Sequence, residues 1–192
     1  MLNTVLGSLS SGVAAATGSY ESIATVTASG GETSLSFTSI PGTYASLQIR
    51  GIMRRADASS NLGRVYLQFN SDTGANYARH QLVGNDAGTV SASGSASVNS
   101  FFAFRGAGAL DASNTFGVGI ADIHDYASTT KYKTTRSFTG LDNNGRSSGT
   151  SEVYLYSGLW QSTSAITRID LVFNGDTAAA GTTFALYGIK GA

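Results

Sequence analysis

Residues 64–70 read Arg-Val-Tyr-Leu-Gln-Phe-Asn, and this short stretch decides the fold class. Every second residue from Val65 to Phe69 is large and apolar, whereas the residues between them are Tyr and Gln. A period of two is typical of a half-buried β-strand, because successive side chains of an extended chain point to opposite faces. The same period recurs in residues 33–39 and 166–173. The alternation therefore predicts an all-β protein.

Eleven stretches of the chain carry strand-like patterns, and turn-forming Gly, Asn and Asp residues separate them. They are Tyr20–Ala28, Thr33–Ser39, Ala45–Arg54, Arg64–Asn70, Asn76–Val83, Ser97–Arg105, Thr115–Asp122, Lys131–Thr139, Glu152–Trp160, Ile166–Phe173 and Thr182–Lys190. We expect one or two of these to be loops, and we expect exposed loops at Thr89–Ser97 and Gly145–Ser151 as well. Many short strands without a convincing helix predict an antiparallel, jelly-roll-like β-sandwich of about 8–10 strands. In this scheme residues 19–192 form the sandwich and residues 1–18 form an N-terminal arm.

The composition favours a role in binding or building over a role in chemistry. Gly, Ser and Thr make up 72 of the 192 residues, whereas only 24 residues are charged and three of these are Glu. Cysteine is absent and there are two His residues. Because catalytic and metal sites are assembled from such titratable side chains, we predict no catalytic residues, no cofactor and no metal. The protein is expected not to be an enzyme.

The overall composition and charge also limit which partners and which cellular compartment are expected. A hydrophobic fraction of 41% suffices for the core of one domain. A net charge of zero argues against a nucleic-acid partner, since nucleic-acid binding depends on clustered Lys and Arg. The chain has no run of 18 apolar residues that would predict a membrane helix. The N-terminal segment lacks the positive charge of a secretory signal, so we expect mature sequence. The absence of cysteine fits a reducing cytoplasm, and it equally fits a protein that never relied on disulfides.

The densest group of titratable side chains is Asp122-Ile-His124-Asp125-Tyr126. A His flanked by carboxylates can act as a general base or as a metal ligand. On a regular strand, Asp122, His124 and Tyr126 would share one face and Asp125 would take the other. No Ser in a nucleophile-elbow context and no second His nearby completes a catalytic triad. We therefore favour ordinary polar residues at a strand end.

One sequence pattern occurs twice. Residues 67–73 read Leu-Gln-Phe-Asn-Ser-Asp-Thr, and residues 171–177 read Leu-Val-Phe-Asn-Gly-Asp-Thr. Each copy is predicted to be a strand that runs into a turn, which the Asn and Asp side chains cap through the backbone. A duplicated half of the sandwich and a pair of calcium sites at Asp72 and Asp176 are the alternatives. Calcium prefers six or more oxygen ligands and each copy offers one carboxylate, so we favour the turns.

Three aromatic residues are expected on one face of a single strand. Tyr154, Tyr156 and Trp160 all occupy even positions, whereas Val153 and Leu155 would lie on the opposite face. A stripe of Tyr and Trp can bind sugar rings, contact a partner protein, or line the core of a sandwich. All three alternatives stay open, and we keep the stripe as a candidate partner interface.

The N-terminal arm is the second candidate interface. Leu2, Val5, Leu6 and Leu9 recur at helical spacing for barely two turns, after which Gly and Ala dominate. A helix this short is unstable on its own. We therefore expect the arm to pack either on its own sandwich or on a neighbouring subunit.

Three stretches carry a resemblance to a known group of proteins. They are Ser-Ile-Pro-Gly-Thr-Tyr-Ala-Ser-Leu-Gln-Ile-Arg-Gly at 39–51, Leu-Gln-Phe-Asn-Ser-Asp-Thr-Gly-Ala-Asn-Tyr-Ala-Arg-His at 67–80, and Phe-Ala-Leu-Tyr-Gly-Ile-Lys at 184–190. Together they resemble small structural proteins of tailed bacteriophages. The resemblance implies a jelly-roll-like virion component, either a capsid cement (decoration) protein or the head domain of a tail or fibre protein. It transfers no functional residues, because the matching patterns are those of sandwich strands.

The resemblance also ranks the functional hypotheses. Fibre proteins carry a long N-terminal shaft, whereas about 18 residues precede the first expected strand here. We therefore expect a cement protein on the capsid surface of a virion, which forms a homotrimer and binds the major capsid protein. The alternative is a tail or fibre module that binds a host glycan through aromatic side chains. A carbohydrate-active enzyme is the third hypothesis, although nothing nominates the pair of carboxylates that it needs.

Overall fold

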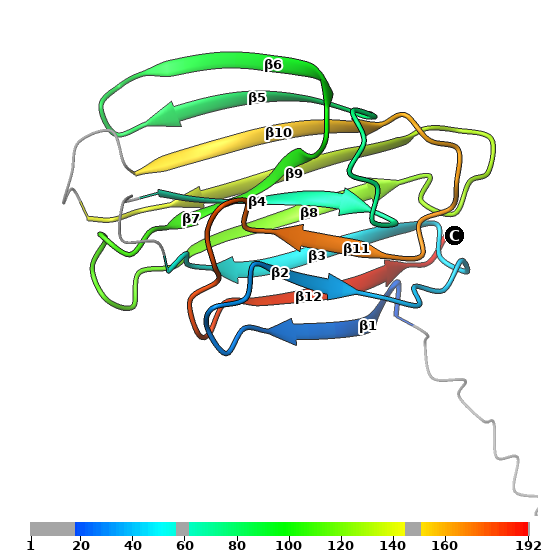
Figure 1. The fold of residues 1–192 in the computed structure, drawn as a ribbon, viewed down its shortest axis with the longest axis horizontal. Helices are drawn as coiled ribbons and strands as arrows, with labels where there is room; N and C mark the ends of the chain where they lie inside the picture. Colours follow the sequence, from blue (N-terminus) through cyan, green and yellow to red (C-terminus); the bar gives the residue numbers. More distant parts are fainter. Residues whose placement is uncertain (1–17, 57–61, 145–150, 192) are drawn as a thin grey trace, which may run out of the picture.

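The computed structural model describes residues 18–56, 62–144 and 151–191, and these form twelve β-strands (Figure 1). In chain order the strands are β1 (Tyr20–Thr27), β2 (Ser34–Phe37), β3 (Ser46–Met53), β4 (Leu62–Phe69), β5 (Tyr77–Asn85), β6 (Val90–Val98), β7 (Phe101–Ala107), β8 (Gly117–His124), β9 (Lys133–Leu141), β10 (Glu152–Trp160), β11 (Ile169–Val172) and β12 (Thr183–Ile189). Neighbouring strands pair antiparallel in two sheets. The prediction of an all-β, antiparallel sandwich is confirmed, and its jelly-roll character stays a prediction.

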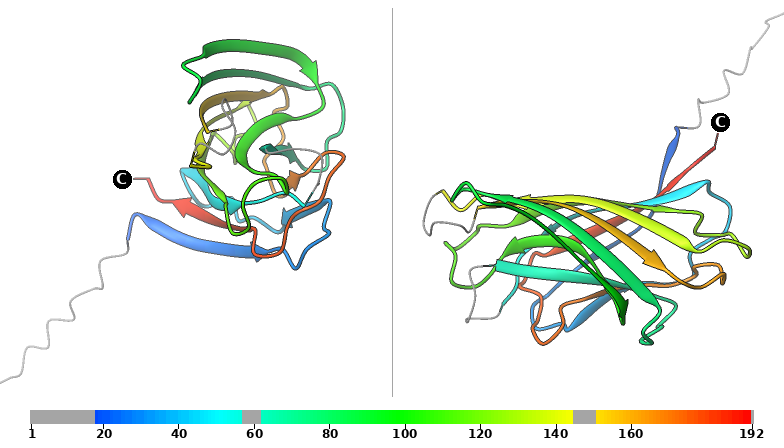
Figure 2. Two further views of the ribbon diagram at one scale, coloured as in Figure 1. Left: turned by 90° about the vertical axis from the view of Figure 1, so that its left-hand side faces the viewer. Right: turned by 90° about the horizontal axis from the view of Figure 1, so that it is seen from above.

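The two sheets differ in size. The larger sheet has eight strands in the order β1-β12-β3-β8-β9-β10-β5-β6, and the smaller has four in the order β2-β11-β4-β7. Strands β5 and β6 lie at the opposite end of the molecule from β1 and β2 (Figures 1 and 2). Because β1 pairs with β12, both ends of the described chain leave from the same edge of the larger sheet.

The eleven predicted strands all overlap observed ones, so the expectation that one or two would be loops is wrong. The predicted loop at Thr89–Ser97 is also wrong, because Val90–Val98 forms β6 and pairs with β5. Its Ser, Ala and Gly residues have no apolar alternation, and backbone pairing with β5 makes it a strand. The strand count therefore exceeds the predicted range. Most of the predicted loop at Gly145–Ser151 lies outside the described residues.

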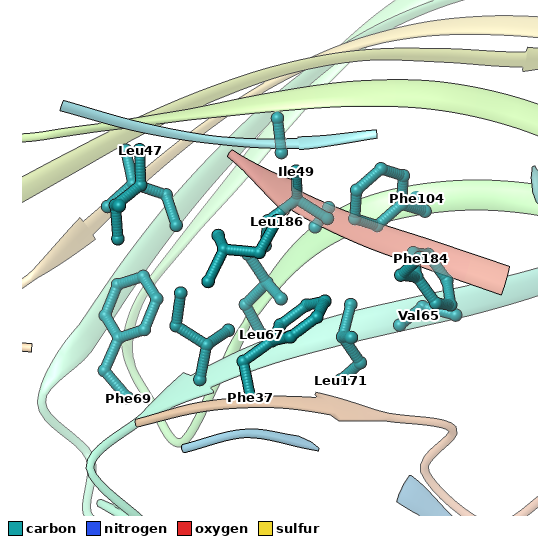
Figure 3. Close-up of a cluster of buried hydrophobic side chains, with 14 of the residues drawn as sticks. Phe37, Leu47, Ile49, Val65, Leu67, Phe69, Phe104, Leu171, Phe184 and Leu186 are labelled. Carbon is teal, nitrogen blue, oxygen red and sulfur yellow. The ribbon is translucent and has the colours of Figure 1, made fainter. Parts of the chain in front are cut away.

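The core lies between the two sheets (Figure 3). Val65, Leu67 and Phe69 of β4 point into it and have no exposed surface, as the alternation in residues 64–70 predicts. The larger sheet supplies Leu47 and Ile49 of β3 from the opposite side. Full burial of an aliphatic or aromatic side chain contributes about 1.5–3 kcal/mol, so this layer drives the association of the sheets.

Gly117 of β8 and Gly106 of β7 allow the edge strand of the smaller sheet to lie close to the larger sheet. A side chain on Gly117 of β8 would overlap the backbone of Arg105 and Gly106 in β7. Glycine in a strand commonly marks such a close approach of two backbones. Strand β7 therefore sits directly on the larger sheet.

The larger sheet also bends round β7. Phe102 lies on the side of β7 that faces away from the main core, and its ring packs against Tyr156 of β10 at 5.5 Å between centroids. Tyr154 and Val83 complete this second apolar cluster. Because Tyr154 and Tyr156 lie on the inner side of β10, strands β10 and β5 must curve past the edge of β7.

Candidate interaction surface

Eight large apolar side chains are exposed on the outer side of the larger sheet, which faces away from the core. We call this surface the apolar face, and it consists of Ile52, Leu82, Val90, Val118, Ile120, Phe138, Val153 and Leu155. Phe138 is 63% exposed and Val118 is 61% exposed. The residues come from six consecutive strands, β3-β8-β9-β10-β5-β6. A contiguous exposed apolar patch on a soluble domain marks an interaction site.

Strand register places these side chains in two adjacent rows. One row consists of Ile120, Phe138, Leu155 and Leu82, each opposite the next. The other row consists of Ile52, Val118, Gly140, Val153, Gly84 and Val90. Directly opposed residues of antiparallel strands have Cβ atoms about 4.5–5.5 Å apart, so neighbours in a row contact one another. The face is therefore continuous across the sheet.

The two glycines of the second row leave a hollow in the apolar face. Its volume is about 890 Å³, and Val118, Phe138 and Val153 are among the residues that line it. A side chain on Gly84 would first meet Val153 at 3.8 Å, which is an ordinary contact distance. At Gly140 a side chain would be tighter, 3.0 Å from Glu152 O. The hollow is therefore open above Gly84, and an anchoring side chain of a partner protein can fill such a space.

A polar row borders the apolar face on the same strands. It consists of Gln48, Asp122, Arg136, Ser157 and His80, opposed in that order. Gln48 Nε2 donates a hydrogen bond to Asp122 Oδ1 at 2.8 Å. Arg136 pairs with the same carboxylate at 3.6 Å. Gln48, Asp122 and Arg136 therefore satisfy one another, whereas nothing in the described part of the chain covers the apolar side chains beside them.

Strand β6 ends the apolar face and leaves an open sheet edge. Its nine residues, Val90–Val98, include no charged residue and no Pro, which are the usual devices against pairing with another strand. Each edge strand has one register shift, after Ser22 in β1 and near Ser97 in β6, but only β1 has a charged pair, between Glu21 and Lys190. The β6 edge is therefore the less protected of the two.

The predicted aromatic stripe faces the core. Tyr154, Tyr156 and Trp160 are 3%, 1% and 2% exposed. We therefore correct the prediction of a partner interface or sugar platform on these residues, because β4 and β7 of the smaller sheet pack against Trp160 and Tyr156. Of the three alternatives for the stripe, the burial of these rings supports the third, that they line the core of the sandwich. The sequence analysis did not identify the opposite side of this strand as an exposed apolar surface. The residues that form it, Val153 and Leu155, are visible in the sequence because they alternate with the aromatic residues.

The titratable group at the end of β8 does not share one face. Asp122 and His124 point outward, but Tyr126 is buried and donates a hydrogen bond to Pro41 O at 2.6 Å. Strand β8 ends at His124 and Asp125 adopts a positive φ of 55°, so the strand alternation stops before Tyr126. The expectation that Tyr126 joins Asp122 and His124 is therefore wrong.

The repeated pattern ends two paired strands of the smaller sheet, because β4 pairs with β11. Asn70 and Asn174 adopt positive φ of 51° and 39°, which turns the chain at the end of each copy. Asp72 accepts a hydrogen bond from Trp160 Nε1 at 2.7 Å, and Asp176 forms an ion pair with an arginine. The contacts support the turn interpretation. Within residues 18–56, 62–144 and 151–191, no group of three His, Asp or Glu side chains is placed to hold a metal ion.

The predicted contacts of the N-terminal arm, Leu2, Val5, Leu6 and Leu9, lie outside the described residues. In the part of the chain that is described, no helix has the length and apolarity to cross a bilayer.

Comparison of the chain with protein-family models, with curated proteins and with solved structures finds no match.

Proposed function

We propose that this protein is a non-catalytic structural subunit, a cement (decoration) protein that binds and stabilises the head of a tailed bacteriophage. The apolar face is the observation that carries the proposal of an assembly role. The type of particle is inferred from the resemblance of residues 39–51, 67–80 and 184–190. In this proposal the protein is made in the host cytoplasm and ends on the capsid surface, where the apolar face docks on the major capsid protein.

The dimensions of the apolar face suit this role. Six strands spaced about 4.8 Å apart give a face about 24 Å wide. A protein interface of standard size buries about 800 Å² on each partner, with an apolar centre and a polar rim. The polar row supplies such a rim along one side of the face. A protein that binds only the assembled shell stabilises it by mass action.

We propose that the N-terminal arm and the β6 edge serve self-association. A homotrimer suits positions of local threefold symmetry, and an arm that leaves from the β1 edge can reach a neighbouring copy. Deletion of residues 1–18 is expected to weaken head binding or trimer formation while the sandwich stays folded. Size-exclusion chromatography with light scattering measures the oligomer, and circular dichroism checks the fold.

A tail or fibre module that binds a host glycan was the alternative from the sequence. It depended on an aromatic platform at Tyr154, Tyr156 and Trp160, and these rings are buried. No exposed aromatic stripe among the described residues replaces them as a platform, so the cement role is preferred.

Cosedimentation with phage heads assembled without this protein tests the proposal. We expect the wild-type protein to bind these heads and Leu155→Asp to bind at least tenfold more weakly, because the new charge lies at the centre of the apolar face. Leu110→Asp is the matched control, since Leu110 is similarly exposed but lies in the β7–β8 connection. Electron micrographs should show the protein on the shell. Its presence at the tail instead, or equal binding by both variants, would contradict the proposal.

A further inference from the structure

Phe102 is the centre of a cationic cluster between β7 and the inner side of β5. The guanidinium carbon of Arg79 lies 4.0 Å from the centroid of the Phe102 ring, and that of Arg64 lies 5.0 Å from it. Tyr66 packs on the same ring at 5.2 Å. Since both guanidinium groups contact one ring, their charges lie within about 10 Å, a Debye length at 0.1 M salt.

These two arginines have no counter-ion in the described part of the chain. The one carboxylate of the cluster, Glu152, is already paired with Arg105 at 3.0 Å and accepts a hydrogen bond from Tyr154. Burial holds the pKa of Arg79 below its ordinary value; Tyr66 opposes this shift and the nearby charge of Arg64 adds to it. Both side chains are half-buried, and cations that are withdrawn from water are normally paired with an anion. The cluster therefore has an excess of positive charge.

Polar atoms without partners gather at the same place. Six buried side-chain atoms in the described ranges have no hydrogen-bond partner. Three of them belong to residues that contact the Phe102 ring, and these are Arg64 Nε, Arg79 Nε and Tyr156 Oη. A fourth is Oε1 of Gln81, which lies opposite Tyr156 on β5. Buried polar groups in native proteins are nearly always satisfied, so this concentration marks the cluster as rich in donors and poor in partners.

A pocket lies beside this cluster and shares two residues with it, whereas Phe102 and Arg64 do not line it. Its volume is about 430 Å³, within the range of small-molecule sites, and Arg79 and Tyr66 lie in its wall. The remaining polar lining is made of hydroxyl and amide side chains, among them Thr73, Ser97, Asn99 and Ser100. Among the described residues, the Arg79 guanidinium donates one hydrogen bond, from Nη1 to Ser100 O at 3.4 Å. Its Nε is enclosed, and its Nη2 makes no hydrogen bond to a described residue.

We propose that this pocket binds a hydroxylated carboxylate of about monosaccharide size, such as a hexuronate. The N–H donors of a guanidinium match the two oxygens of a carboxylate, so Arg79 would hold the charged end. Ser, Thr and Asn side chains both donate and accept, which suits the hydroxyl groups of a sugar acid. The Tyr66 ring offers an apolar surface to the ring of the ligand.

The pocket is independent of the docking surface. It lies on the inner side of β5, where Arg79 pairs with Ser95 of β6, whereas Leu82 of the apolar face points to the outer side. Ligand binding can therefore be measured on the isolated protein, and its outcome does not depend on the proposed capsid role.

Isothermal titration of the full chain at low ionic strength tests the site. The probes are sodium glucuronate, glucose and sodium sulfate. We expect saturable binding of glucuronate, with glucose and sulfate at least tenfold weaker, because each lacks one of the two features that the pocket recognises.

Variants identify the residue that holds the carboxylate. Arg79→Gln and Arg79→Lys should each weaken glucuronate binding at least tenfold, the second because it keeps the charge and loses the planar pair of donors. Arg136→Gln is the control, since Arg136 is exposed in the polar row. Thermal unfolding confirms that each variant is folded. Absence of saturable glucuronate binding, binding unchanged in Arg79→Lys, or sulfate binding as tight as glucuronate would each overturn the proposal.

Discussion

The outer side of the larger sheet has two halves that differ in chemistry although the same strands build both. Along β8 and β9 the chain passes from Ile120 and Phe138 in the apolar face to Asp122 and Arg136 in the polar row. The polar half is complete in the single chain, because its charged groups pair with one another. The apolar half remains open to water, which favours burial against another surface. The difference indicates that one half meets solvent and the other meets a partner.

The largest expected effect is a difference in the free energy of unfolding between substitutions on the buried side of β10 and on its exposed side. Tyr156→Ala should lower the free energy of unfolding by about 3–5 kcal/mol, because it removes a buried ring from the second cluster. Leu155→Ala, one residue away on the open side, should change it by about 0.5 kcal/mol or less. Urea unfolding of the isolated protein measures both. A large loss in Leu155→Ala would show that the apolar face is already covered in the single chain.

A smaller effect, on the binding of a hydrophobic dye, is expected when a lysine is placed in the apolar face but not when it is placed in the polar half of the same sheet. Phe138→Lys should reduce the fluorescence of a hydrophobic dye bound to the protein several-fold, since it breaks the row between Ile120 and Leu155. Thr134→Lys, four residues away on β9 beyond the polar row, should leave the dye signal unchanged. Equal losses in the two variants would mean that the halves do not differ in exposed apolar surface.

The smallest predicted effect concerns a polar contact on the covered side. Burial raises the pKa of Asp72, but hydrogen bonds from Trp160, Asn76 and Gly74 outweigh it and hold the pKa below its ordinary value. The ionised carboxylate therefore stabilises the fold above the unfolded-state pKa of about 3.9, and this contribution is lost as the pH falls through the lower, folded-state pKa.

Asp72→Asn tests this titration. The variant should lose about 1 kcal/mol of stability at neutral pH and show a weaker fall in stability on acidification. Urea unfolding at a series of pH values measures both quantities. An unchanged acid dependence in the variant would assign the titration to another group.

Alternation predicted where the strands lie but not which of their sides is covered. In β10 both sides are apolar, so Tyr156 and Leu155 look equally suited to a core, and only the position of β7 decides between them. The β6 strand was missed because its Ser and Ala residues have no contrast between sides. Tyr126 was placed on the wrong face because the positive φ at Asp125 ends the strand alternation. The strand pattern in the sequence contains no signal for that φ.

The pocket at Arg79 was beyond sequence reasoning for a related reason. Arg64 and Arg79 come from different sheets, and they meet on Phe102 only because the larger sheet bends round β7. The sequence places these two arginines on separate predicted strands and contains no signal for that curvature.

Cysteine labelling tests the central claim most directly, because the chain has no native cysteine. Leu155→Cys places a single thiol in the apolar face, and Ser157→Cys places one in the polar row of the same strand. Both thiols should react rapidly with a maleimide in the isolated protein. On assembled phage heads, Leu155→Cys should be protected while Ser157→Cys remains reactive. Equal labelling of Leu155→Cys in the free and head-bound states would contradict the claim that the apolar face is the docking surface.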